Sequence, residues 1–191
     1  MSTESVNAGP VNADPAGLVA AAVAETYHSA RLEFRPQVPD DAGAFAALLG
    51  GDRDAIMMTA SMPWPCTEEA MRRWIEGRGT ASPYFTIRRR EDGAVLGSIG
   101  WKDAKPVAVI GYWIGLPFRG QGYVQEAVAF ALDLLRERGY REVVGNTFAQ
   151  NHVSRRVLER MGFAYDGDYV SDLPQRGGQR PSCRYVYRLA D

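Results

Sequence analysis

The sequence predicts an α+β fold in which helices flank a mixed, mostly antiparallel central sheet of about six to seven strands. Three observations lead to this prediction. Two strand-like runs flank the turn residues Asp92 and Gly93, a pair typical of hairpins. A third strand follows after a short connection, which favours an antiparallel meander. Helices then link further strands, and such units attached to a meander produce a mixed sheet.

The N-terminal part of the domain alternates between strand and helix patterns. Residues 1–30 read as an N-terminal extension, a polar tail followed by an Ala-rich helix from about 15 to 27, and residues 31–191 as a single domain. Periodicity and capping residues predict a strand at 31–36, a helix at 39–50, an irregular stretch at 51–66 and a helix at 67–77.

The remaining elements follow from the same signals. The meander strands are expected at 83–90, 94–101 and 107–116. Apolar residues at 124, 127, 128, 131 and 135 have helical spacing and predict a helix at 123–138 that Gly139 ends. A strand at 142–149, a helix at 151–161 and two closing strands at 163–170 and 182–189, around a turn-rich loop at 171–181, complete the prediction.

Composition excludes several classes of function. The 22 basic and 23 acidic residues give a net charge of −1, so a nucleic-acid partner is not expected. Cys66, Cys183 and the two histidines form no metal-ligand spacing, which favours a reduced cytoplasm and no metal. The apolar run at 16–24 lacks the basic start of a signal peptide, and the longest later uncharged run, 106–118, is too short for a bilayer. We therefore expect no membrane association.

The segment with a chemical signal is the run I-G-L-P-F-R-G-Q-G-Y-V-Q-E at 114–126. It passes from a buried strand through two glycines, Gly120 and Gly122, into an amphipathic helix. Glycine lets the backbone approach a ligand, while the free N–H groups of a first helical turn and the helix dipole attract an anion. With Arg119 adding a full charge, a diphosphate fits best. The run lacks the Lys of a Walker loop and the first glycine of a dinucleotide fingerprint.

These residues resemble the acetyl-CoA loop of the GCN5-related N-acetyltransferases, Q/R-x-x-G-x-G/A, with Pro117 at the Gln/Arg position. The run A-Q-N-H-V-S-R-R-V-L-E-R-M-G-F at 149–163 resembles the family's second signature. R-L-E-F-R-P at 31–36 resembles the start of the branch that acetylates ribosomal-protein N-termini. The resemblance covers about residues 30–190 and implies an acetyl-CoA-dependent N-acetyltransferase that acts on an amine as a monomer or homodimer.

The resemblance also assigns site residues. It places the pantetheine arm along the strand that contains Ile114 and Leu116, and next to Asn151. It implies that Ser154 protonates the departing thiolate. The ordinary alternative is that Asn151 caps a helix and Ser154 is a tolerated first-turn residue. The pyrophosphate would lie on Arg119, Gly120, Gln121, Gly122, Tyr123 and Val124.

The implied reaction is direct attack of a neutral amine on a thioester, without a covalent enzyme intermediate. The strand at 107–116 contains no acid, so Asp103, Glu126, Tyr112 or a water relay remain as candidates for the base. An α-amine is neutral far more often at pH 7 than a lysine amine, and this favours an α-amine acceptor. Cys66 as an acyl-carrying nucleophile is disfavoured because no histidine lies near it in the sequence.

Acceptor choice is expected to lie in the loops at 51–66 and 171–181, which leave small amines as an alternative to protein N-termini. A second alternative is a non-catalytic acyl-CoA sensor. The arginines at 88–90 are predicted to form a solvated strand end. Arg176, Arg180 and Arg184 are expected in a solvated loop, with an acidic substrate or the CoA 3′-phosphate as alternative partners.

Overall fold

The computed structural model describes residues 25–78 and 82–190, which form an eight-stranded sheet with helices on both faces. Its strands are β1 (Tyr27–His28), β2 (Leu32–Pro36), β3 (Tyr84–Arg89), β4 (Val95–Ala104), β5 (Val107–Ile114), β6 (Glu142–Phe148), β7 (Ala164–Leu173) and β8 (Gly178–Arg188). Within these ranges the α-helices are α2 (Ala42–Leu49), α3 (Arg53–Met57), α4 (Glu68–Glu76), α5 (Tyr123–Glu137) and α6 (His152–Arg160). Short 3-10 turns are η1 (Pro39–Asp41), η2 (Leu116–Phe118) and η3 (Pro174–Arg176).

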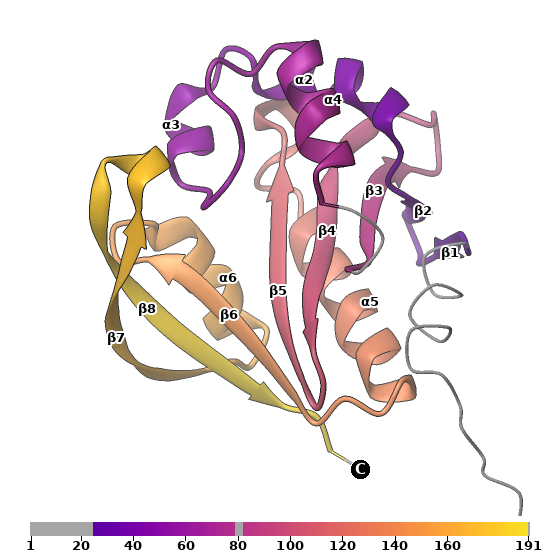
Figure 1. The fold of residues 1–191 in the computed structure, drawn as a ribbon. Helices are drawn as coiled ribbons and strands as arrows, with labels where there is room; N and C mark the ends of the chain where they lie inside the picture. The colour runs from indigo at the N-terminus through magenta and orange to yellow at the C-terminus, as the bar shows by residue number, and fades with distance from the viewer. Residues whose placement is uncertain (1–24, 79–81, 191) are drawn as a thin grey trace, which may run out of the picture.

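The strands lie in the order β1-β2-β3-β4-β5-β6-β8-β7 (Figure 1). All neighbouring pairs in this sheet are antiparallel except β5 and β6, which run parallel. The predicted α+β class with a mixed, mostly antiparallel sheet is confirmed. The count reaches eight because Tyr27 and His28, within the expected N-terminal extension, pair with β2. The expected helix at about 15–27 lies almost wholly outside the described residues.

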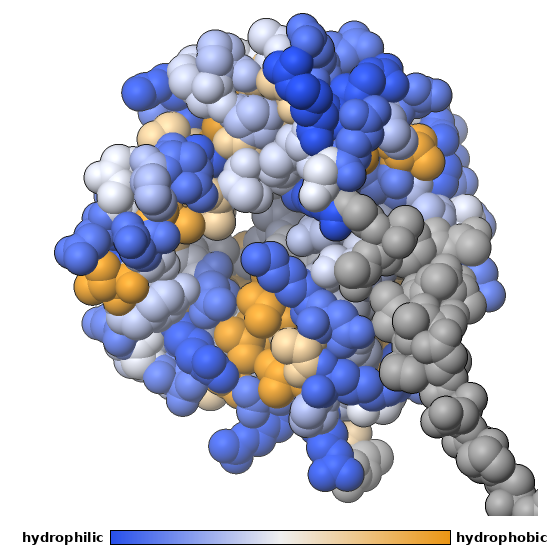
Figure 2. Space-filling model, viewed as in Figure 1, coloured by the Kyte–Doolittle hydropathy of each residue, from blue (hydrophilic) through white to orange (hydrophobic). Residues whose placement is uncertain are grey.

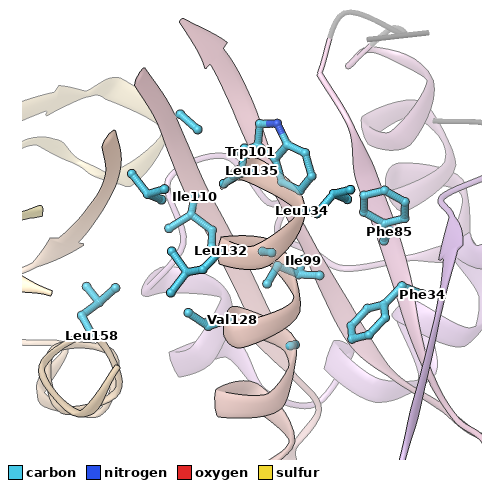
Figure 3. Close-up of a cluster of buried hydrophobic side chains, with 14 of the residues drawn as sticks. Phe34, Phe85, Ile99, Trp101, Ile110, Val128, Leu132, Leu134, Leu135 and Leu158 are labelled. Atoms are coloured by element: carbon cyan, nitrogen blue, oxygen red, sulfur yellow. The ribbon is translucent and has the colours of Figure 1, made fainter. Parts of the chain in front are cut away.

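Helices cover the two faces of the sheet with separate hydrophobic clusters. On one face α5 presents its predicted stripe, including Val128 and Leu135, to side chains of the central strands, and Leu132 packs with them (Figure 3). Phe34 of β2 stacks on Phe130 of α5 with ring centroids 3.8 Å apart. On the other face α2, α3 and α4 enclose a second cluster. The two clusters fix α5 and the α2–α4 group on opposite sides of the central strands.

Local signals in the sequence account for several element boundaries. The Thr67 hydroxyl accepts a hydrogen bond from the Ala70 N–H and caps α4 as predicted. Gly93 has a φ of 71° and turns the β3–β4 hairpin. Asp41 accepts hydrogen bonds from the Val38 N–H and the buried Thr86 hydroxyl, which ties η1 to β3. The contact between Asp41 and Thr86 therefore holds the start of α2 against β3.

The structure differs from the sequence prediction in three places. The stretch at 51–66 contains the short helix α3, capped by the Asp52 side chain, which accepts from the Ala55 N–H. The predicted loop at 171–181 is mostly strand, because β7 and β8 extend to a tight turn at Gly177 and Gly178, both with positive φ. Leu116 was expected to continue the third meander strand, but β5 ends at Ile114 and Leu116 lies exposed in η2.

Candidate active site

The sheet opens where its two parallel strands part. The last paired residues of β5 and β6 are Ile110 and Gly145, and β5 continues to Ile114 without a strand beside it on that edge. The space-filling view shows a hollow in the middle of this face, where Figure 1 places the upper part of β5 (Figure 2). Backbone groups along the parted edge are therefore available to a ligand.

The strand register decides which backbone groups face the gap. The Gly115 N–H bonds to the Leu96 carbonyl on the β4 side, so alternate residues counted back from Gly115 also face β4. The N–H and C=O of Tyr112 and Ile114 consequently point toward the gap. The sequence prediction paired Ile114 with Leu116, whereas the structure pairs it with Tyr112. Alternate residues of a strand face the same edge, so Tyr112, two residues before Ile114, could have been predicted from the sequence in place of Leu116.

The glycine loop after β5 forms an open N-terminus for α5. Gly120 and Gly122 have φ values of 75° and 80°, as the prediction of a glycine-dependent turn requires. Gly122 is the N-cap residue, and no side chain caps the helix. A Cβ placed on Gly120 would meet nothing within 4 Å, so the space over the loop is open. The first-turn N–H groups of α5 thus face an unfilled space suited to an anion.

Two arginines hold this loop in place. Arg119 donates from Nε to the Ile114 carbonyl at 2.9 Å and from a terminal nitrogen to Asp52 at 2.8 Å. Its guanidinium therefore bridges the end of β5 to the cap of α3. Arg31, just before β2, donates to the Gln121 carbonyl at 3.0 Å. The Gln121 side chain bonds to the Pro117 carbonyl at 3.1 Å, while Tyr123 and Val124 pack into the core side of α5.

Helix α6 brings a hydroxyl to the same gap. The Ser154 Oγ lies 3.2 Å from the Tyr112 hydroxyl. The Asn151 side chain accepts from the Ser154 N–H at 3.1 Å and caps α6, so the capping role weighed for Asn151 is confirmed. Burial raises the pKa of Tyr112 to about 12, against a smaller lowering effect of the Ser154 hydrogen bond. Tyr112 is thus a neutral phenol at physiological pH and can donate a hydrogen bond.

The carboxylates considered as bases lie elsewhere. Asp103 pairs with Ala108 near the opposite end of β5, where its side chain accepts from the Lys105 N–H. Glu126 binds Arg31 and the Ser29 hydroxyl. Burial acts to raise the pKa of Glu126, but the hydrogen bonds from Ser29 and Arg31 outweigh it and leave the pKa below its usual value. Neither side chain is a proton acceptor in the gap.

Arg176 clasps the two loops that flank the hollow. The sequence prediction placed this arginine in a solvated loop, but the side chain is only 4% exposed. It donates to the Thr59 and Met62 carbonyls, both at 2.6 Å, and the Gln175 side chain donates to the Ala60 carbonyl at 2.9 Å. The tip of the β7–β8 hairpin is therefore fastened to the segment after α3, across the opening between β5 and β6.

The other residues weighed from the sequence lie outside the gap. Arg184 pairs with Glu142 and Asp166, and the Arg180 guanidinium lies over the Phe148 ring. Cys66 is buried in the cluster of α2–α4, where burial raises the pKa of its thiol. A buried, protonated thiol is a poor nucleophile, which agrees with the low weight given to an acyl-enzyme.

Comparisons with known proteins decide which family has this arrangement. The family described as "Acetyltransferase (GNAT) domain" matches residues 31–164. The chain belongs to the GNAT acetyltransferase family. The predicted resemblance to it is confirmed, and the protein is an N-acetyltransferase of a family that uses acetyl-CoA. No curated protein sequence matches the chain.

Solved GNAT structures share the fold at low identity. A ribosomal-protein-S5-alanine acetyltransferase from Vibrio fischeri superposes with a TM-score of 0.71 and 14% identity, over 87% of this chain and 98% of that one. A probable GNAT acetyltransferase from Chromobacterium violaceum gives 0.76 and 18%, over 98% and 97%. RimL, a ribosomal L7/L12 α-N-protein acetyltransferase solved with coenzyme A, gives 0.71 and 21%, over 86% and 98%. These likenesses establish the fold.

The described residues fit acetyl-CoA at the parted strands. Backbone groups of Tyr112 and Ile114 are exposed to the gap, and the space over Gly120 is free next to uncapped N–H groups.

No helix in the described part of the chain is long and apolar enough to span a bilayer.

Proposed function

We propose that this GNAT acetyltransferase transfers an acetyl group from acetyl-CoA to the α-amine of a protein or peptide. The observation that carries the proposal is the gap between β5 and β6, where the Tyr112 amide, the Tyr112–Ser154 hydroxyl pair and the open N-terminus of α5 converge. A strand edge can pair with an extended pantetheine arm, and a helix N-terminus can hold its diphosphate.

The proposed donor contacts are mostly to the backbone. Tyr112 and Ile114 supply amide groups to the pantetheine arm, although Arg119 already uses the Ile114 carbonyl. The N–H groups from Gly120 to Val124 hold the diphosphate, because the Arg119 N–H bonds to the Leu116 carbonyl. Asn151 offers its side-chain amide from the start of α6. The guanidinium of Arg119 serves the loop instead of the diphosphate, because Asp52 and Ile114 bind it. Leu116 has no place on the strand edge.

The proposed chemistry needs one proton to leave the amine and one to reach the sulfur. The amine attacks the thioester carbonyl, whose oxygen gains charge that a gap-facing N–H can stabilise. The Ser154 hydroxyl protonates the departing thiolate and regains a proton from water, and the neutral Tyr112 phenol, 3.2 Å away, positions it. Water carries the amine proton away, since neither Asp103 nor Glu126 lies in the gap.

The absence of these two carboxylates from the gap favours an α-amine. An α-amine with a pKa near 8 is about 10% neutral at pH 7, whereas a lysine amine near 10.4 is about 0.04% neutral. An acceptor that is already partly neutral needs less help from an enzyme base. The free N-terminus of a peptide is the acceptor class that combines such an amine with an extended chain.

A small amine is the second candidate acceptor, and the Arg176 clasp is the observation that favours it. The contacts of Arg176 and Gln175 with residues 59–62 bridge the opening on the acceptor side. A bridged opening admits a slender group more easily than a folded surface. A small amine meets this condition whatever its shape, whereas a peptide meets it only if its N-terminal end is flexible, so the acceptor assay must include both.

Donor binding is tested with two variants of equal size. Gly120 has a positive φ and open space around its Cβ position, and both Asn and Asp tolerate such a backbone. Titration calorimetry with acetyl-CoA should show that Gly120→Asp weakens binding at least about tenfold more than Gly120→Asn, because only the carboxylate repels the diphosphate. Equal affinities of the two variants would place the diphosphate elsewhere.

Acceptor class is tested by thiol release from acetyl-CoA. We expect turnover with peptides that carry a free N-terminus and none with the same peptides N-terminally blocked but containing lysine. Polyamines and amino acids form the small-molecule arm. Turnover only in that arm would replace the peptide acceptor by a small amine, and turnover with blocked lysine peptides would contradict the α-amine argument.

A further inference from the structure

A small pocket lies beside the first residue of α5, on the side of the loop away from β6. Its volume is about 180 Å³, and it is lined by Ala30, Arg31, Arg89, Arg90, Glu91 and Tyr123. These residues come from the segment just before β2, the β3–β4 turn and the first turn of α5. The pocket therefore adjoins the loop proposed to hold the diphosphate, and a Cβ on Gly122 would lie 3.4 Å from a terminal nitrogen of Arg31.

Three guanidinium groups in this pocket are fixed by the protein but keep unused N–H donors. Arg31 binds Glu126 and the Gln121 carbonyl through Nε and one terminal nitrogen. Arg89 forms two hydrogen bonds to Asp92. Each guanidinium has five N–H groups, so both retain donors after these bonds. Contacts that fix the side chains in advance lower the entropy cost of binding an anion.

Arg90 differs from the other two because carbonyls hold it. One of its terminal nitrogens donates to the Ser29 and Ala30 carbonyls at 2.8 and 3.3 Å. Within residues 25–78 and 82–190 no carboxylate lies within ion-pair distance of Arg90. Glu91 is the one acidic side chain among the described residues that line the pocket. The pocket thus contains an uncompensated guanidinium suited to an anionic group.

The size of the pocket limits what it can take. Sites for whole small molecules usually enclose about 300 Å³ or more. A smaller, arginine-lined pocket beside a larger site suits a single charged group of a ligand bound mainly elsewhere. Acetyl-CoA carries such a group, a phosphate monoester on the ribose next to its diphosphate.

We propose that this pocket binds the 3′-phosphate of acetyl-CoA, with Arg90 as its main ligand and Arg31 and Arg89 as supports. The proposal rests on the proposed function, because the diphosphate must lie at the N-terminus of α5 to bring the ribose here. It replaces the prediction that residues 88–90 are only a solvated strand end. It also moves the 3′-phosphate away from Arg176, Arg180 and Arg184, which lie on or beside the β7–β8 hairpin.

The competing location is the exposed face of α6, on the other side of the gap, where Arg156 is exposed and forms no ion pair with a described residue. Arg156→Ala is therefore the matched control for Arg90→Ala. Both changes remove one exposed guanidinium, and neither residue packs in a hydrophobic cluster. Glu91→Gln is expected to have the opposite effect and to strengthen binding of the phosphate, because it removes the carboxylate that lines the pocket.

The experiment compares dissociation constants for acetyl-CoA and its 3′-dephospho analogue, measured by calorimetry on the full chain. We expect the wild-type chain and Arg156→Ala to prefer acetyl-CoA by about tenfold or more, the effect of a charge-assisted contact. Arg90→Ala should lower the ratio of the two affinities to about one. Its affinity for the dephospho analogue should stay at the wild-type value, and this unchanged affinity also shows that the variant folds. Glu91→Gln should increase the preference.

The outcomes separate this inference from the proposed function. Equal wild-type affinities for the two compounds would overturn the 3′-phosphate pocket and leave acetyl-CoA binding intact. Loss of the preference in Arg156→Ala, and not in Arg90→Ala, would move the phosphate to α6 and overturn it as well. A wild-type chain that binds neither compound would overturn the proposed function, and the inference with it.

Discussion

The hydroxyl of Tyr112 lies 3.2 Å from the hydroxyl of Ser154, across the gap where β5 and β6 part. This contact joins a strand that pairs with β4 to a helix that follows β6. We expect Ser154→Ala to lower kcat about a hundredfold, as for loss of a general acid, without changing the affinity for acetyl-CoA. Tyr112→Phe should lower kcat by less. Steady-state rates with calorimetric affinities measure both effects.

The Ser154→Ala variant should keep its fold. The Asn151 side chain accepts its hydrogen bond from the backbone N–H of residue 154, which the substitution does not remove. Arg156→Ala, on the exposed face of α6, is a suitable control for changes in this helix. A fall in acetyl-CoA affinity that matches the fall in kcat would show that Ser154 supports the binding site instead of acting on the proton.

The pH dependence should follow the acceptor. The pKa of Tyr112 is about 12 and Glu126 is ionised in its ion pair, so neither changes charge between pH 6 and 9.5. The rate constant kcat/KM should therefore rise with pH as the amine loses its proton, with a midpoint near the α-amine pKa of about 8. Two peptides whose α-amines have different pKa values should give two midpoints. A common midpoint for both peptides would reveal an enzyme base.

The ion pair that holds α5 makes a separate prediction about stability. Glu126 accepts hydrogen bonds from the Arg31 N–H at 2.8 Å and from the Arg31 guanidinium at 2.7 Å. We expect Glu126→Gln to lower the free energy of unfolding at pH 7 by roughly 1–3 kcal/mol, the usual loss for a hydrogen-bonded charge. Urea unfolding measures this difference.

The stability lost in Glu126→Gln should become smaller as the pH falls. The folded-state pKa of Glu126 is lowered, so its stabilisation is complete above the unfolded pKa of about 4.3 and disappears as the pH falls through the folded value. The gap in stability between wild type and Glu126→Gln should therefore narrow in acid. A difference that stays constant down to pH 3 would assign the loss to packing.

Local sequence was sufficient where a short-range contact defines the element. Thr67 caps α4 through a bond three residues away, and Gly93 turns the hairpin by its own backbone angle. The glycine loop was found for the same reason, since Gly120 and Gly122 need their positive φ whatever surrounds them. These elements and the class of the sheet could be predicted from the residues alone.

Contacts between distant residues account for what the sequence prediction missed. Asp52 starts α3 but is also bound by Arg119, 67 residues away. Arg176 read as a solvated loop residue because its partners, the Thr59 and Met62 carbonyls, lie more than a hundred residues earlier. Register along β5 depends on pairing with β4, so the role of the Tyr112 amide required the sheet.

The Arg176 clasp gives the last prediction. Arg176 is buried and its donors bind the Thr59 and Met62 carbonyls, so Arg176→Ala leaves both carbonyls without this partner. We expect the acceptor KM to rise about tenfold or more while the affinity for acetyl-CoA stays unchanged, because its proposed contacts are with β5 and the N-terminus of α5 and not with Arg176. Arg184→Ala is the control, because this arginine of the same hairpin pairs with Glu142 and Asp166 instead. Hydrogen exchange should show faster exchange at residues 59–62 in Arg176→Ala alone, and an unchanged acceptor KM despite that loosening would mean that the clasp does not shape the acceptor site.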